Sequence, residues 1–410
     1  MSFWHPFADM AAVSKSELLI ERGEGVWVFD SDENRYLDAT ASLWYANIGH
    51  ARAEVADAVA AQLRTLEAYH TFGDFSNRPA NEVCERLAAL APVDDARVFL
   101  TSGGGDSIEV AAKLARRHFI NQGQPERVHL ISRTHGYHGT HGFGTTLGGI
   151  EPNVTNWGPL IPQASVVPYD SLQALEAEVL RVGPDKVAAF FCEPVIGAGG
   201  VRLPPEGYIQ GVADLCAEHG ILLVIDSVIC AFGRLGTWFG VERWPDVRPD
   251  MITFAKGVTS GYIPLGGVVA SGKIAEPYYN GEAPMFRHGA TYAGHPAACA
   301  AALAVLDIYE GEGLIERGRE LEGPLADGVN SLADHPAVAE VRAGLGFLAA
   351  LGLNPDADAA APARLVAGAR EKGVLVRAVI GGVAMSPPLI ADQEHIYLLV
   401  EGLRAGLDRV

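Results

Sequence analysis

Five short, largely apolar segments in the middle of the chain constrain its fold more than any other feature. They span residues 98–101, 128–131, 188–191, 222–225 and 251–254. Between them lie amphipathic stretches, such as 107–121 and 207–219, that have the pattern of helices. Strands that are apolar on both faces and alternate with helices are typical of a buried, mainly parallel sheet. Residues 51–300 are therefore predicted to form an α/β domain.

The two ends of the chain have a different pattern. Residues 26–37 predict a β-hairpin, in which a polar turn at 31–34 joins two short strands. After residue 300, an alanine-rich helix leads into a mixture of helices and short strands. Composition alone leaves open whether these two regions pack together.

The net negative charge of the chain argues against one class of partner, the nucleic acids. Of its 410 residues, 49% are hydrophobic, enough for a large core, and the formal net charge is −19. Binding to a polyanion needs clustered Lys and Arg, so a nucleic-acid partner is not expected. The five cysteines are widely spaced and include no CxxC pair. This spacing argues against a disulfide framework and against a zinc site, so no metal is expected.

No targeting or membrane segment is expected either. The N-terminus lacks a basic region followed by an apolar stretch, and no apolar run is as long as a bilayer span. Together with the unpaired thiols, these features predict a cytoplasmic protein.

Lys256 stands apart from the other five lysines, which lie in helical or surface-like contexts. It directly follows the apolar segment 251–255 and precedes a glycine. Open α/β sheets bind ligands at the carboxyl ends of their strands. An amine that is partly removed from water loses proton affinity, which favours its attack on an aldehyde. Taken alone, a lysine after a strand is more often an ordinary charge at the end of that strand.

Asp226 gives Lys256 a possible chemical partner. It ends the apolar segment 221–225, thirty residues before the lysine. A carboxylate in this place can bind the N–H of a pyridinium ring and keep the ring able to accept electrons. A turn or helix-capping aspartate is the alternative interpretation. The pairing with Lys256 favours the first.

A glycine-rich turn at residues 102–107 follows the first apolar segment and opens a helix. Its free N–H groups and the helix dipole favour a phosphate group. Such a turn also suits a nicotinamide dinucleotide. However, Ser107 stands where the third glycine of GxGxxG would fall, and the turn lies about 100 residues into the chain rather than in a leading βαβ unit. A dinucleotide-dependent dehydrogenase is therefore the weaker alternative.

The sequence His-Gly-Tyr-His-Gly at residues 135–139 follows the second apolar segment. Its glycines would let Tyr137 lie flat on a planar ring. The two histidines are close together and have no acidic neighbours in the sequence, so they do not predict a metal site. The alternative is an ordinary loop with structural histidines.

In the order of these elements and in the residues of each motif, the chain resembles the class III (omega) aminotransferases of the fold-type I pyridoxal-phosphate enzymes. The resemblance extends almost from end to end, and its motifs lie at residues 4–7, 36–38, 43–44, 47–50, 193–200, 232–234, 255–257, 291–296 and 386–388. It implies a large domain with a mainly parallel seven-stranded sheet flanked by helices. It also implies that residues 1–50 and 301–410 join into a smaller, discontinuous α+β domain.

The resemblance assigns the cofactor, pyridoxal 5′-phosphate, to a set of residues. Lys256 resembles the lysine that carries it as a Schiff base and that moves the proton in catalysis. Asp226 resembles the partner of the ring nitrogen, and Tyr137 and Val228 would enclose the ring. The remaining contacts would come from the phosphate loop, the two motifs around it and the other subunit of a homodimer: Gly104, Gly105, His138, Glu193 and Thr291.

The resemblance also implies the reaction. Trp44 resembles the aromatic wall of the substrate pocket in the branch that uses amines and β-alanine. Arg377 matches a mobile arginine that binds a keto-acid carboxylate, although a surface arginine on a strand is the alternative for it. The expected activity is ping-pong transfer of an amino group from an ω-amino acid, a diamine or a primary amine to a keto acid such as pyruvate.

Four departures from the family pattern accompany the resemblance. Ser227 stands where a glutamate is usual, which predicts the loss of a local ion pair. Ala290 replaces a larger aromatic residue, Gly105 a serine and Gly381 an aspartate. None removes a residue that the chemistry needs, so they suggest a specialised substrate. The alternatives are an aminomutase, a decarboxylase or a racemase on the same fold, and a silent homologue that only binds or regulates.

Overall fold

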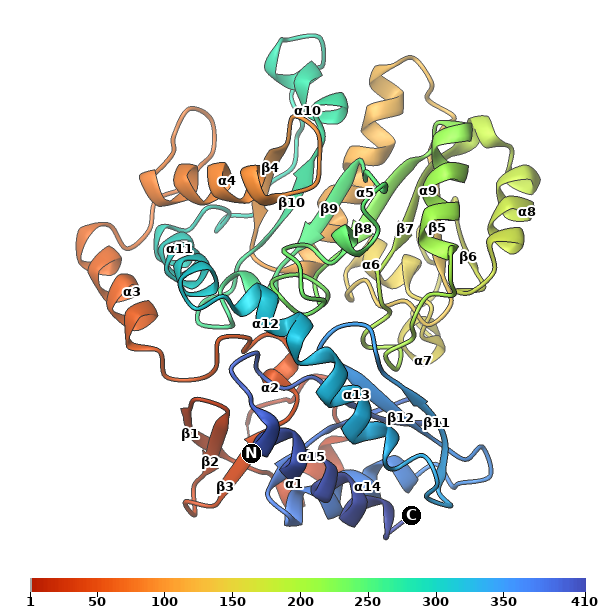
Figure 1. Cartoon of the computed structure of the whole chain (residues 1–410). Coiled ribbons are helices and arrows are strands. Elements are labelled where there is room, and N and C mark those ends of the chain that lie inside the picture. Colours follow the sequence, from red (N-terminus) through yellow and green to blue (C-terminus); the bar gives the residue numbers. More distant parts are fainter. Residues whose placement is uncertain (1) are drawn as a thin grey trace.

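A seven-stranded sheet forms the centre of the larger part of the molecule. The computed structural model describes residues 2–410 and places this sheet in the upper half of Figure 1. The order across the sheet is β4 (Arg97–Thr101), β10 (Gly266–Ala270), β9 (Met251–Phe254), β8 (Leu222–Asp226), β7 (Val187–Cys192), β5 (His129–Arg133) and β6 (Ala164–Val167). The five strands from β9 to β6 are parallel, whereas β10 is antiparallel to both of its neighbours, β4 and β9.

Alternate residues of the central strands are buried on opposite faces of this sheet. On β8, Leu222 and Val224 pack in the same cluster as helix α5 (Gly104–Asn121). Leu223 and Ile225 belong instead to the main core with α9 (Tyr208–His219). Because both faces are covered, each strand is apolar throughout, which is why the sequence pattern predicted these strands correctly.

Further helices surround the sheet and extend from it. Those that precede residue 300 are α3 (Ala53–Thr65), α4 (Arg78–Leu90), α6 (Gly142–Leu147), α7 (Glu151–Val154), α8 (Leu172–Val182) and α10 (Gly272–Tyr279). Helix α11 (Pro296–Gly311) packs against α3 and α4. No helix within residues 2–410 has both the length and the apolar character needed to cross a membrane.

The lower half of the molecule joins segments from both ends of the chain (Figure 1). The predicted hairpin is formed by β2 (Trp27–Asp30) and β3 (Arg35–Asp38). Strand β1 (Ile20–Glu24) pairs with the free edge of β2. Strand β13 (Val374–Leu375) pairs in parallel with β3, so residues more than 300 positions apart share one sheet.

A second four-stranded sheet in this half is antiparallel throughout. Its strands, in spatial order, are β11 (Val338–Arg342), β12 (Ala349–Leu353), β15 (Gly382–Met385) and β14 (Arg377–Val379). The helices of this half are α1 (Met10–Ser16), α2 (Ala41–Trp44), α12 (Leu314–Glu320), α13 (Glu322–Asn330), α14 (Ala361–Glu371) and α15 (Gln393–Leu407).

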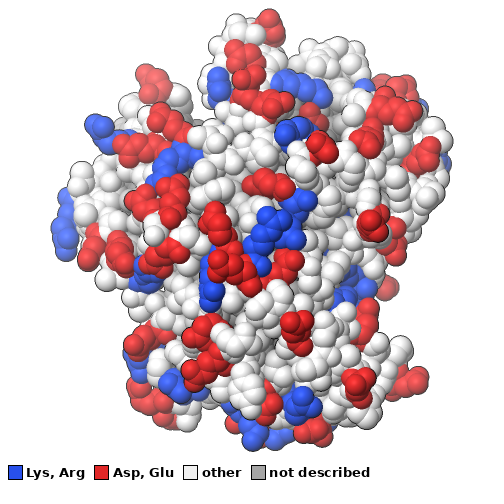
Figure 2. All heavy atoms as spheres, viewed as in Figure 1, with Lys and Arg blue, Asp and Glu red and all other residues white. Residues whose placement is uncertain are grey.

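Charged groups are distributed over the outer surface. Figure 2 shows acidic side chains over all parts of the face in view, with basic side chains between them. This distribution agrees with the net charge of −19.

Candidate active site

The carboxyl ends of the parallel strands surround one cavity. Lys256 follows β9, Asp226 is the last residue of β8, and Tyr137 follows β5. Since parallel strands end at the same edge of a sheet, residues far apart in the sequence meet there. All the predicted cofactor residues except Thr291 line this cavity: Gly104, Gly105, Tyr137, His138, Glu193, Asp226, Val228 and Lys256.

Lys256 is held in a conformation that a non-glycine residue rarely adopts. Its φ is 49°, in the left-handed region, at the start of a short 3-10 helix after β9. The next position, Gly257, leaves no room for a side chain, since a Cβ there would lie 2.7 Å from the amide nitrogen of Asn47. Residues in sparsely populated conformations persist where the surrounding structure determines them, which occurs often at functional sites.

Burial sets the proton affinity of this amine. Removal from water lowers the pKa of Lys256 to about 8, although the carboxylates of Asp226 and Glu193 act in the opposite direction. A larger share of the amine is therefore neutral near neutral pH than for an exposed lysine. A neutral amine is the form that attacks an aldehyde and accepts a proton from carbon.

The lowered pKa predicts how the cofactor-free protein recombines with pyridoxal phosphate as pH changes. Below pH 8 the rate of covalent attachment should rise about tenfold per pH unit, because the neutral amine increases in that proportion. Above about 8 the rate should level off. Stopped-flow absorbance between pH 6 and 10 measures this profile. A rate that keeps rising to pH 10 would show that the amine behaves as an exposed lysine.

Three hydrogen bonds fix the carboxylate of Asp226. One oxygen, Oδ2, lies 2.7 Å from Nδ1 of His138, and both residues are buried. The other, Oδ1, accepts hydrogen bonds from the Val228 N–H (3.1 Å) and the Thr253 hydroxyl (3.0 Å). Thr253 faces Asp226 directly across the β8–β9 pairing. A carboxylate held in this way presents negative charge at a defined point of the cavity.

The contact between His138 and Asp226 corrects one expectation from the sequence. The two histidines of residues 135–139 had no acidic neighbours in the sequence, but His138 has an acidic partner 88 positions away. The partner was missed because the contact joins the loop after β5 to the last residue of β8, which are far apart in the sequence. Within residues 2–410, no group of three or more His, Cys, Asp or Glu side chains is placed to hold a metal ion.

Glu193 positions the loop that carries Tyr137. Its buried carboxylate accepts hydrogen bonds from the N–H of Tyr137 (3.0 Å) and the N–H of Gly197 (2.9 Å). Burial raises the pKa of Glu193 above its ordinary value. The carboxylate therefore joins two loops that border the cavity.

The glycine turn brings the backbone close to the cavity at the start of α5. A Cβ on Gly104 would lie 3.0 Å from both methyl groups of Val228, and one on Gly105 would lie 3.3 Å from the His141 ring. Helix α5 begins at Gly104, three residues earlier than the sequence predicted. The first N–H groups of a helix have no partner within it, so this end can bind a phosphate.

These features fit pyridoxal phosphate. The cavity offers an amine for its aldehyde (Lys256), a buried carboxylate for its ring nitrogen (Asp226) and an 18-residue helix whose N-terminus can take the phosphate. Tyr137 and Val228 supply the surfaces between which a flat ring can lie.

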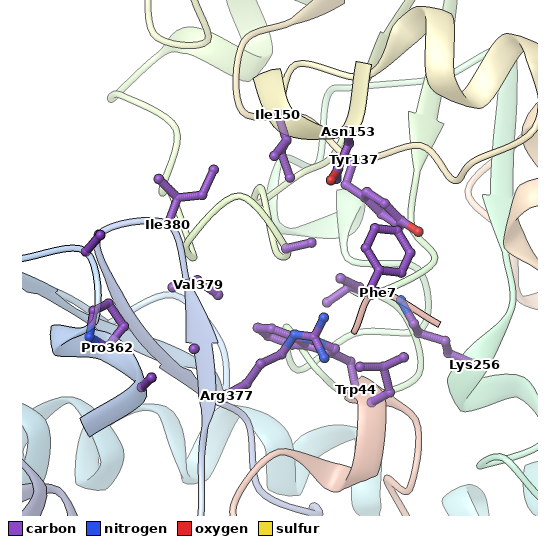
Figure 3. A pocket seen from close by; sticks show the side chains of 17 residues that line it. Phe7, Trp44, Tyr137, Ile150, Asn153, Lys256, Pro362, Arg377, Val379 and Ile380 are labelled. Atoms are coloured by element: carbon purple, nitrogen blue, oxygen red, sulfur yellow. The ribbon is translucent and has the colours of Figure 1, made fainter. Parts of the chain in front are cut away.

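A second cavity, of about 480 Å³, adjoins the first and shares Tyr137 and Lys256 with it. Figure 3 shows Lys256 at one end, with Trp44 and Arg377 reaching into the space beside it. Arg377 lies on β14 and is half-buried, and removal from water lowers the pKa of its guanidinium. Phe7, whose ring centre is 6.5 Å from that of Tyr137, lines the same cavity.

Trp44 owes its position to a tightly folded segment at residues 41–44. Ala41, Ser42 and Trp44 all have positive φ angles, which is strained for residues with side chains. Asp38 holds the segment, because its carboxylate accepts hydrogen bonds from the Ser42 N–H (2.6 Å) and the Thr40 hydroxyl (3.1 Å). The strain is thus balanced by buried polar contacts, which fix the indole against the cavity.

The predicted site residues therefore form two groups, one around each cavity, and one residue lies outside both. The cofactor group surrounds the first cavity, and Trp44 and Arg377 line the second. Thr291 is exposed and lines neither cavity of its own chain. The sequence reasoning missed Thr253 as a partner of Asp226, and Asn153 and Ile150 as part of the second cavity.

Comparison with known proteins points to one family. The family model for class-III aminotransferases matches residues 10–407. A putrescine–pyruvate aminotransferase of Pseudomonas aeruginosa is 35% identical, over 98% of this chain and 93% of its own. An omega-aminotransferase of Caulobacter vibrioides is 34% identical, over 100% and 98%. An amine transaminase from an uncultivated Pseudomonas species, solved in its pyridoxal-phosphate-bound form, is 38% identical with a TM-score of 0.95, over 100% of this chain and 99% of the other.

Proposed function

The chain belongs to the class-III aminotransferase family, and we propose that it moves amino groups from an ω-amino acid, a diamine or another primary amine to a keto acid such as pyruvate. Its cofactor is pyridoxal 5′-phosphate. The observation that carries the proposal is the partly buried Lys256, whose amine lies at the junction of two cavities. One cavity suits the cofactor, and the other can admit first an amine and then a keto acid.

Pyridoxal phosphate, when bound, supplies an aldehyde that takes up the amino group and a ring that accepts electrons from the donor's α-carbon. Lys256 Nζ takes the proton from that carbon, and later returns a proton, because its amine lines both cavities. Asp226 would hold the ring N–H, with His138 and the Thr253 hydroxyl fixing its carboxylate. Tyr137 and Val228, which line the same cavity, would enclose the ring.

Arg377 serves the second half of the cycle. A keto acid brings a carboxylate, which a guanidinium binds through two parallel hydrogen bonds. The half-buried position of Arg377 on β14 strengthens this attraction, because water screens it less. The carbonyl product of the donor leaves the cavity before the keto acid enters it. One cavity can therefore bind both substrates in turn.

Incubation of the cofactor-loaded protein with donor alone tests this function. One equivalent of carbonyl product should form per active site, the cofactor absorbance should change once, and no carbon dioxide should be released. Added pyruvate should then yield alanine and restore the first spectrum. Release of carbon dioxide, or an isomerised amine in place of a carbonyl product, would identify decarboxylase or aminomutase chemistry instead.

We also propose that the active unit is a homodimer in which Thr291 serves the partner's phosphate site. The loop at 290–294 is fastened to residues 71–77, since the Thr71 hydroxyl donates to Ala293 O (3.0 Å) and the Asn77 amide donates to Gly294 O (2.9 Å). Next to it, Tyr69, Phe72 and Phe75 are each about half exposed. Exposed aromatic clusters of this kind favour contact with another protein surface.

Two smaller proposals follow from the same fold. We propose that residues 51–300 form the large domain and that residues 1–50 and 301–410 form the small one, which the pairing of β3 with β13 supports. We propose a cytoplasmic location, which the five free thiols support because such thiols are typical of a reducing compartment.

A further inference from the structure

The end of the substrate cavity remote from Lys256 is apolar. Segments on both sides of Arg377 form it, from the start of α14 and the end of β14. Figure 3 shows Pro362, Val379 and Ile380 on the far side of the arginine from the lysine, and Ile150 across the cavity from the arginine. We refer to Ile150, Pro362, Ala363, Val379 and Ile380 as the outer wall. The Ile380 side chain is 52% exposed, so it offers apolar surface that a ligand can cover.

The charges along this cavity are all of one sign. Among the residues of positions 2–410 that line it, Lys256 and Arg377 are the only charged side chains, and none is acidic. Two acidic residues lie next to lining residues in the sequence: Asp358, which pairs with Arg364 at 2.9 Å, and Glu151, which is exposed and does not line the cavity. A second ammonium on a donor would therefore meet a cation and apolar groups, without a carboxylate to offset its loss of water.

From this chemistry we propose that the enzyme prefers monoamines with an extended apolar substituent and uses diamines poorly. This inference rests on the proposed function and selects among its donor classes. The reacting amine lies at Lys256, the substituent passes Trp44 and Arg377, and its end covers the outer wall. Each methylene buried there raises kcat/KM by roughly fourfold, as for burial of a CH₂ group.

A matched series of donors tests the inference with pyruvate as acceptor and alanine as the measured product. Butylamine, hexylamine and octylamine are compared with 1,4-diaminobutane and 1,6-diaminohexane. We expect kcat/KM to rise along the monoamines. Each diamine should be at least about tenfold poorer than the monoamine of equal length, because its second ammonium faces Arg377. Equal or faster use of the diamines would overturn the inference.

Substitutions on one helix locate the effect. Ala363→Glu places a carboxylate at the outer wall and should raise the diamine-to-monoamine ratio of kcat/KM by about tenfold. Ala367→Glu is the matched control, because Ala367 is exposed one turn further along α14 and does not line the cavity. Ile380→Ala should lower the use of octylamine relative to butylamine. Equal ratios in Ala363→Glu and Ala367→Glu would contradict the inference.

The same assay distinguishes a failure of the donor preference from a failure of the proposed aminotransferase function. If alanine forms but diamines are the better donors, the donor preference is wrong while the aminotransferase function stands. If no amine of the series yields alanine from a cofactor-loaded protein, the proposed function and the donor preference both fail.

Discussion

Replacing Lys256 with alanine is expected to lower kcat for alanine formation by about 10⁴-fold or more. Among residues 2–410, Lys256 carries the only amine that lines both cavities, so its loss removes the group that holds the cofactor covalently and the base that moves the proton. Added amines can replace only part of this function, because they are not held at a fixed point. Steady-state rates with saturating donor and pyruvate measure the loss.

A second variant shows whether the Lys256→Ala chain is folded. Thr291→Asp should abolish activity by itself, because its carboxylate would repel the cofactor phosphate in the partner subunit. In hybrid dimers, one site takes Lys256 from the Thr291→Asp chain and Thr291 from the Lys256→Ala chain, so it is intact. Equal co-expression should restore about a quarter of the wild-type activity. Substantial turnover by Lys256→Ala alone would contradict the assignment of the lysine.

Replacing Asp226 with asparagine is the second large effect that we expect. The amide keeps the shape and can still accept hydrogen bonds from the Val228 N–H and the Thr253 hydroxyl, but it carries no negative charge. Without that charge, the ring nitrogen of the cofactor holds its proton less well and the ring accepts electrons poorly. We expect kcat to fall roughly 10²- to 10³-fold, the size typical of removing one charge-stabilising group.

Thr253→Val serves as the control for this variant. It removes one hydrogen bond to Asp226 Oδ1 but leaves the charge and the contact with His138. Its kcat should stay within about tenfold of the wild type, in line with the loss of a single hydrogen bond. If Asp226→Asn retained nearly full activity, the carboxylate would have no electronic role.

The large domain could be predicted from the sequence because its central strands are buried on both faces. Strands β7, β8 and β9 have apolar residues at nearly every position, and the structure finds each of them within one or two residues of the predicted bounds. Strands β6 and β10 were not among the five predicted segments. Strand β6 lies at the edge of the sheet and is only partly buried, and β10 begins with two glycines, so both lack the continuous apolar pattern of a central strand.

The start of α5 differs from its prediction for a related reason. Glycine is a poor helix former, so the sequence favoured a start at Ser107, but the helix begins at Gly104. At this end of a helix, close approach of the backbone matters more than helix propensity, because Val228 packs against Gly104.

The site was predictable where a single strand end carried the signal, and hidden where it depended on distant contacts. Lys256 and Asp226 each end an apolar strand, so the general rule for parallel sheets identified both. The hydrogen bond between His138 and Asp226 joins the loop after β5 to the end of β8, 88 positions apart in the sequence. The outer wall combines residues near 150, 362 and 380, which only the folded chain brings together.

Chemical trapping of the cofactor on the protein shows directly whether Lys256 is the residue that carries it. Borohydride reduction fixes pyridoxal phosphate to the amine that holds it, and proteolysis with mass spectrometry then identifies the labelled peptide. We expect one label per chain, on the peptide that contains Lys256, and none after preincubation with an amine donor, which converts the cofactor to a form that is not attached to the protein. Label on any of the other five lysines, or no label in an active preparation, would contradict the account.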